Sequence, residues 1–119
     1  MEIPKEIEHA IIRTYVGWKN KYELIKVTQM TAKKRKLYSR GLRMGGICYV
    51  MEQLNFTGEV KQELENMVGQ VDAILEEIRV GSKTSALNQI KDGLIEYANI
   101  IKRYFPDIYD KHKDTLTWK

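Results

Sequence analysis

The fold of this chain is decided most clearly by residues 57–81, TGEVKQELENMVGQVDAILEEIRVG. Thr57 is a suitable N-cap, Glu59 places a negative charge in the first turn, and Gly81 is suited to a left-handed residue after the last turn. Between these ends, apolar residues recur at alternating intervals of four and three, as on one stripe of an α-helix. The stripe comprises Val60, Leu64, Met67, Val71, Ile74 and Ile78.

Two more stripes of this kind lie on either side of the first along the chain. One follows the polar residues 82–85 and ends before Pro106, with Lys102 and Arg103 near the negative end of the helix dipole. Its members are Leu87, Ile90, Leu94, Tyr97, Ile101 and Tyr104. The other begins after Pro4, which suits a first helical turn, and Gly17 can break or kink it. Its members are Ile7, Ile11, Tyr15, Trp18, Tyr22 and Ile25.

A fourth helix is expected in the segment between the N-terminal stripe, which ends at Ile25, and Thr57. It carries Leu37, Met44, Ile47, Met51 and Leu54, with Gly41, Gly45 and Cys48 as a strip of small residues beside them. The pair Gly45-Gly46 can also mark a bend. Near the C-terminus, Asp107 can cap a short turn that ends at about His112. The sequence therefore predicts one all-α domain over residues 1–119, an up-down four-helix bundle with a short C-terminal helical turn.

Composition narrows the class of protein. The chain has 119 residues, of which 43% are hydrophobic and 30% charged, as in globular helical proteins and unlike disordered chains. It has no apolar run of membrane-spanning length, and its charged N-terminus lacks the apolar core of a signal peptide. The single cysteine, Cys48, cannot form an internal disulfide. We therefore expect a cytoplasmic protein with no membrane partner.

Charge is distributed unevenly along the chain, although the net charge is only +4. Residues 13–43 contain a single acid, Glu23, and ten basic residues: Arg13, Lys19, Lys21, Lys26, Lys33, Lys34, Arg35, Lys36, Arg40 and Arg43. Residues 44–80 contain seven acids and only two bases, Lys61 and Arg79. The chain is therefore electrically lopsided, with a basic segment and an acidic segment that are complementary.

The densest basic run, residues 31–43, predicts a nucleic-acid-binding surface. Cations in rows along a helix can meet the phosphates of a nucleic-acid backbone, and Tyr38 and Ser39 can add stacking or a hydroxyl contact. The candidate binding residues are Lys33, Lys34, Arg35, Lys36, Arg40 and Arg43. Phosphate contacts do not read bases, so DNA or RNA would be bound independently of sequence. The alternative is a solvated helix face, or one that pairs with the acidic helix of this chain or of another copy.

No group of residues predicts catalysis or a cofactor. Residues 81–84, GSKT, resemble the end of a phosphate loop but lack its first glycine and preceding strand, so we interpret them as a turn between helices. His112 stands among aspartates at spacings that fit no metal motif, which favours a polar, partly frayed C-terminus. Cys48 has apolar neighbours and is expected in the core. We expect a protein that is not an enzyme and holds no metal.

Trp118 is the second candidate site. A tryptophan beside the C-terminus either packs back on the bundle or binds a partner, because tryptophan is enriched in interface hot spots. The functional alternative to nucleic-acid binding is therefore a protein-interaction module: an adaptor, an inhibitor or a self-assembling subunit. Complementary basic and acidic segments also lead us to expect a homo-oligomer.

Overall fold

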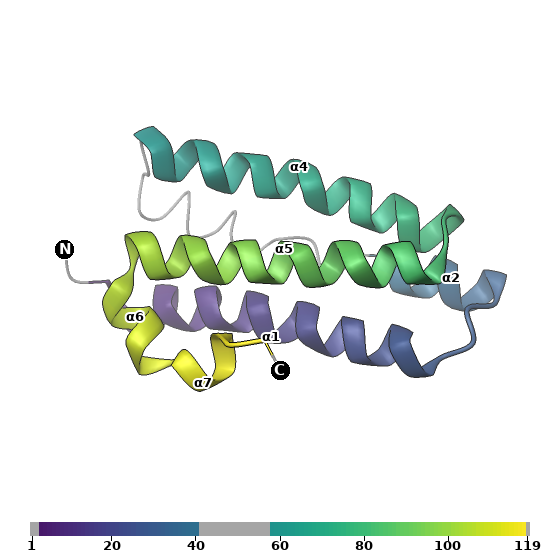
Figure 1. Ribbon diagram of the computed structural model, residues 1–119, viewed down its shortest axis with the longest axis horizontal. Helices are drawn as coiled ribbons and strands as arrows, with labels where there is room; N and C mark the ends of the chain where they lie inside the picture. The colour runs from purple at the N-terminus through teal and green to yellow at the C-terminus, as the bar shows by residue number, and fades with distance from the viewer. Residues whose placement is uncertain (1–2, 41–57, 119) are drawn as a thin grey trace.

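The computed structural model describes residues 3–40 and 58–118. Within these ranges every regular element is a helix, which confirms the all-α class for this part of the chain. The helices are α1 (Lys5–Val27), α2 (Ala32–Ser39), α4 (Gly58–Val80), α5 (Lys83–Tyr104), α6 (Pro106–Lys111) and α7 (Lys113–Leu116) (Figure 1). None of these helices has the length and apolar composition needed to span a membrane.

Three long helices form the body of the molecule. Helix α5 packs against both α4 and α1, and it runs antiparallel to each of them (Figure 1). The short helix α2 packs on α4, and the chain after α5 folds back so that α7 contacts α1. The predicted four-helix arrangement depends on residues 41–57, which lie outside the described residues, so that arrangement stays a prediction.

The three predicted stripes form one hydrophobic core. Helix α4 buries Leu64, Met67, Val71, Ile74 and Ile78, and α5 buries Ile90, Leu94, Tyr97 and Ile101 together with Ala86, Ala98 and Ile100. Helix α1 runs unbroken through Gly17, so the glycine does not end it. On α1 the structure differs from the predicted stripe at one turn, because Lys21 is buried and Tyr22 only half-buried.

The end of α4 is built differently from the prediction. Gly81 does not adopt a left-handed conformation; among the described glycines, Gly58 has the positive φ, at 68°. The Gly81 N–H donates to the Glu77 carbonyl at 2.8 Å and continues the helical pattern. A left-handed residue normally satisfies the last carbonyls of a helix. Here a side chain of α2 takes that role, as described below.

Two further expectations meet a different structure. Helix α2 ends at Ser39, where Arg40 has a non-helical ψ of 95°, so no continuous helix carries Leu37 into the following segment. Leu37 is 51% exposed and does not join the core. The C-terminus forms α6, the predicted short helical turn, followed by α7, and these helices bury Ile108 and Leu116. Gly41, Gly45, Gly46 and Cys48 lie outside the described residues.

Candidate nucleic-acid interface

Helix α2, which carries the basic run, has little contact with the core: only its half-buried Tyr38 packs against it. The Thr31 hydroxyl caps it by accepting from the Lys34 N–H at 3.2 Å. None of its eight residues is buried. An isolated helix of this length is unstable in water, because nucleation costs more than a few hydrogen bonds return. Contacts with the rest of the molecule must therefore hold it in place.

Arg35 provides the strongest of these contacts. Its guanidinium donates to the carbonyls of Gly81 at 2.7 Å and Ile78 at 3.2 Å, and to the Met30 carbonyl at 3.3 Å. The Ile78 carbonyl belongs to the last turn of α4, where carbonyls have no partner within the helix and the dipole attracts a cation. Arg35 thus fastens α2 to the turn between α4 and α5, through hydrogen bonds from its Nε and Nη1 atoms.

A second cation holds the other end of α2. The buried Lys21 ammonium of α1 donates to the Tyr38 carbonyl at 2.8 Å and lies 5.0 Å from the centroid of the Trp18 ring. Burial disfavours the charged ammonium and lowers the pKa of Lys21 to about 8. Tyr38 itself is half-buried and packs against the core, so its ring is not presented to solvent as a stacking platform.

The turn that resembles a phosphate loop is satisfied internally. The Ser82 hydroxyl caps α5 by accepting from the Ser85 N–H at 3.0 Å, and the Ser82 N–H donates to the Glu77 carboxylate at 3.0 Å. The Lys83 ammonium donates to the Thr28 carbonyl at the end of α1, at 2.9 Å. These groups act as helix caps and cross-links, which agrees with a turn between helices.

The remaining cations of α2 gather around one hollow in the surface. Lys33, Lys34, Lys36 and Arg40 line it together with Leu37, and its volume is about 310 Å³. All four cations are exposed. None forms an ion pair within residues 3–40 and 58–118, although the Lys34 ammonium lies 5.9 Å from the Tyr38 ring centroid. The structure therefore brings together four of the six predicted residues; Arg35 points elsewhere, and Arg43 lies outside the described residues.

An acidic hollow occupies a different part of the surface. Glu63 of α4 and Asp92 and Glu96 of α5 line it, with the half-exposed Ile95 among them. Arg103 pairs with Glu63 at its edge. Within the described residues, no group of histidine, cysteine or carboxylate side chains is placed to hold a metal ion. Only Glu63 of this hollow belongs to the acidic segment 44–80, since Asp92 and Glu96 come from α5, so the hollow does not follow from the charge distribution along the sequence.

Trp118 packs back on the protein. Its ring meets the edge of Tyr22 with centroids 4.9 Å apart, and the Lys19 ammonium lies 3.4 Å from its centroid. Lys91 of α5 is also near, at 5.6 Å. Of the two expectations for Trp118, packing on the bundle is the one seen in this structure, and the half-buried ring is engaged within the chain.

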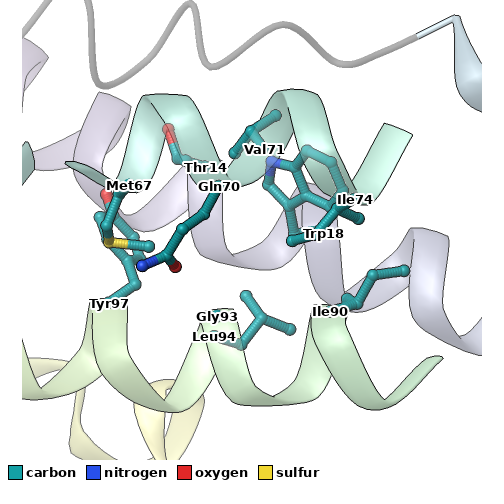
Figure 2. A pocket seen from close by; sticks show the side chains of 10 residues that line it. All are labelled: Thr14, Trp18, Met67, Gln70, Val71, Ile74, Ile90, Gly93, Leu94 and Tyr97. Carbon is teal, nitrogen blue, oxygen red and sulfur yellow. The ribbon is translucent and has the colours of Figure 1, made fainter. Parts of the chain in front are cut away.

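A small space lies between α1, α4 and α5. Side chains of all three helices converge on it, among them Thr14, Trp18, Met67, Leu94 and Tyr97 (Figure 2). It amounts to about 20 Å³, room for about one water molecule. Its hydroxyls also have partners, since Thr14 donates to the Ala10 carbonyl and Tyr97 to the Ile11 carbonyl, both at 2.8 Å. The space belongs to core packing.

Sequence reasoning missed the roles of two residues at the basic surface. Leu37, assigned from the sequence to a longer apolar helix, is exposed and lines the basic hollow, and Lys21, one of the ten basic residues of segment 13–43, is buried. A signal for Lys21 was present, because it lies three residues after Trp18 and four before Ile25, on the buried side of the helix. The chain matches no family model, and comparisons with curated proteins and with solved structures give no match. We therefore infer function from the residues themselves.

Proposed function

We propose that the protein binds the backbone of nucleic acid, DNA or RNA, independently of sequence and without catalysis. The observation that supports this is the cluster of Lys33, Lys34, Lys36 and Arg40 around one exposed hollow. Helix α2 contains no acidic residue that would neutralise them. Unpaired cations at such spacing release counterions when they meet phosphates, which is the main source of non-specific nucleic-acid affinity.

The cations that anchor α2 differ from the cations that face solvent, and this difference supports the same proposal. Arg35 and Lys21 hold the helix by its backbone and by helix-end carbonyls, so the other four cations need not contribute to folding. The four cations are close together and form no ion pair within residues 3–40 and 58–118, so their mutual repulsion is a cost. Binding of a polyanion relieves that repulsion.

The test is a fluorescence-anisotropy titration with labelled DNA and RNA at about 50 to 200 mM salt. One variant replaces Lys33, Lys34, Lys36 and Arg40 with glutamine and leaves Arg35 intact. The matched control replaces four exposed cations elsewhere with glutamine: Lys5, Arg13, Lys61 and Lys113. Both variants lose the same charge, so a difference between them reports where the nucleic acid binds.

We expect the α2 variant to lose binding, and the slope of log K against log salt for a single strand to fall by about 3, which corresponds to four phosphate contacts. The control variant should keep most of the affinity and slope. Equal losses in the two variants would show that only net charge matters. Absence of binding by the unmodified protein at low salt would overturn the proposal.

The second candidate function is protein interaction, favoured by the acidic hollow around Ile95. An exposed isoleucine among Glu63, Asp92 and Glu96 suits a partner that combines a basic and an apolar surface, including another copy of this chain. Sedimentation velocity at low and moderate salt tests self-association. An Asp92→Asn, Glu96→Gln variant should dissociate if this hollow holds the partner copy.

A further inference from the structure

We infer that the basic hollow of α2 selects single-stranded over double-stranded nucleic acid, with Leu37 as the contact for an unstacked base. This inference rests on the proposed function, because it concerns the same surface. Leu37 is 51% exposed and lines the hollow together with the four cations. An exposed leucine in a hollow lined otherwise by cations is a combination that phosphate binding alone does not explain.

Helical geometry explains why the cations surround Leu37. Lys33 and Lys34 lie four and three residues before it and Arg40 three residues after it, so all are its neighbours on the helix surface. From Lys33 to Ser39 the helix rises about 9 Å, and Arg40 follows directly after its last residue. If a base packed on Leu37, the phosphates before and after that nucleotide would lie near the two ends of the hollow, close to the cations.

The character of the surface favours a base over a sugar–phosphate backbone. The exposed surface of the hollow is mostly apolar, because the Leu37 side chain and the aliphatic stems of the basic residues line it. A duplex hides the faces of its bases by stacking and presents phosphates and sugars. A single strand can turn a base outward and bury one of its faces on an apolar side chain.

No aromatic side chain of α2 can replace Leu37 in this contact. Tyr38 is half-buried and packs against the core, and the Tyr38 carbonyl accepts from Lys21. Leu37 is therefore the apolar group that α2 offers at the centre of its cations. Base faces are shared by all nucleotides, so such a contact keeps the binding independent of sequence.

The experiment compares three labelled probes of about 12 nucleotides. The first is a single strand of thymidines, the second is the same strand paired with its complement, and the third is a single strand with abasic positions that keep the phosphates. The unmodified protein should bind the thymidine strand at least about fivefold more tightly than either of the other two.

Leu37→Ala is the test variant, and Leu24→Ala is the matched control, because Leu24 of α1 is also 51% exposed but does not line the hollow. Both sites are exposed, so neither substitution removes core packing, and circular dichroism checks the fold. We expect Leu37→Ala to weaken binding of the thymidine strand about fivefold and to leave the abasic strand and the duplex unchanged. Leu24→Ala should change none of the three.

Equal affinity for single strand and duplex, or an equal loss for all probes in Leu37→Ala, would overturn the inference and leave backbone binding intact. A loss confined to the duplex would instead show that Leu37 acts as a wedge between base pairs, which also contradicts it. Failure to bind any of the three probes would overturn the proposed function itself.

Discussion

Lys21 lies on the buried side of α1, bonded to the Tyr38 carbonyl, with a pKa lowered by burial from 10.5 to about 8. In the unfolded chain Lys21 has its ordinary pKa of 10.5. At pH values between about 8 and 10.5 the unfolded chain therefore binds more protons than the folded one, and the free energy of unfolding rises with pH. Burial raises the pKa of Tyr15 and Tyr97, which reverses this trend above about pH 10, where unfolded tyrosines ionise.

Lys21→Met removes this titrating group. Methionine does not titrate, so the stability of the unmodified protein relative to this variant should increase by about 2 kcal/mol between about pH 7.5 and 9.5. Urea unfolding followed by circular dichroism measures it. Lys26→Met, at an exposed position of the same helix, is the control and should show no such change. A pH-independent difference for Lys21→Met would mean that the Lys21 pKa is not lowered.

At the scale of the element, α2 depends on Arg35. Its hydrogen bonds join α2 to the turn between α4 and α5, and hydrogen bonds to a charged group are stronger than neutral ones. Arg35→Gln should therefore lower the free energy of unfolding by about 2 kcal/mol. Lys33→Gln, on the exposed side of the same helix, should change it by less than about 0.5 kcal/mol.

Thermal or urea unfolding of the two variants gives the comparison. Similar stability for both would contradict the anchoring role of Arg35. The comparison also matters for binding experiments. If Arg35 is substituted together with the other cations, a loss of binding cannot be separated from a loss of the helix that carries the binding residues.

The long elements were predictable because their stripes are continuous and their ends are marked. In α4 and α5 the buried apolar side chains follow the predicted stripes, and Ser82 caps α5 as the polar residues 82–85 indicated. Periodicity placed Leu37 on a core stripe, because spacing alone does not tell where a helix ends. The basic cluster was predictable as a group, since residues close together in a short helix stay close in space.

The assignment of Arg35 within that cluster was not predictable. Its partners, Ile78 and Gly81, lie more than forty residues away in sequence. No local pattern separates a cation that binds carbonyls across the fold from one that faces solvent. Gly81 was misjudged for the same reason, because the carbonyls that a left-handed glycine would satisfy are satisfied from a distant helix.

At the scale of the whole molecule, the two ends of the described chain are joined. Glu8 in α1 pairs with Lys111 at 3.0 Å, and this hydrogen bond is the main reason that the pKa of Glu8 is lowered. Trp118, which follows α7, packs on Tyr22 of α1. Helices α6 and α7 therefore lead the chain from the end of α5 back to α1, so the C-terminal residues contact the N-terminal helix. A closed arrangement of this kind should unfold cooperatively.

The contact between the C-terminal helices and α1 can be tested at Leu116, which is 2% exposed and lies in α7. Leu116→Ala removes buried apolar contacts and leaves a cavity, so it should lower the free energy of unfolding by about 3 kcal/mol. The exposed neighbour Thr115→Ala is the control and should change it by less than about 0.5 kcal/mol. In a cooperative molecule, tryptophan fluorescence and helical circular dichroism should give the same unfolding midpoint in both variants. If fluorescence changes at lower denaturant than the helical signal, the tail opens on its own, and the joined ends do not stabilise the whole molecule.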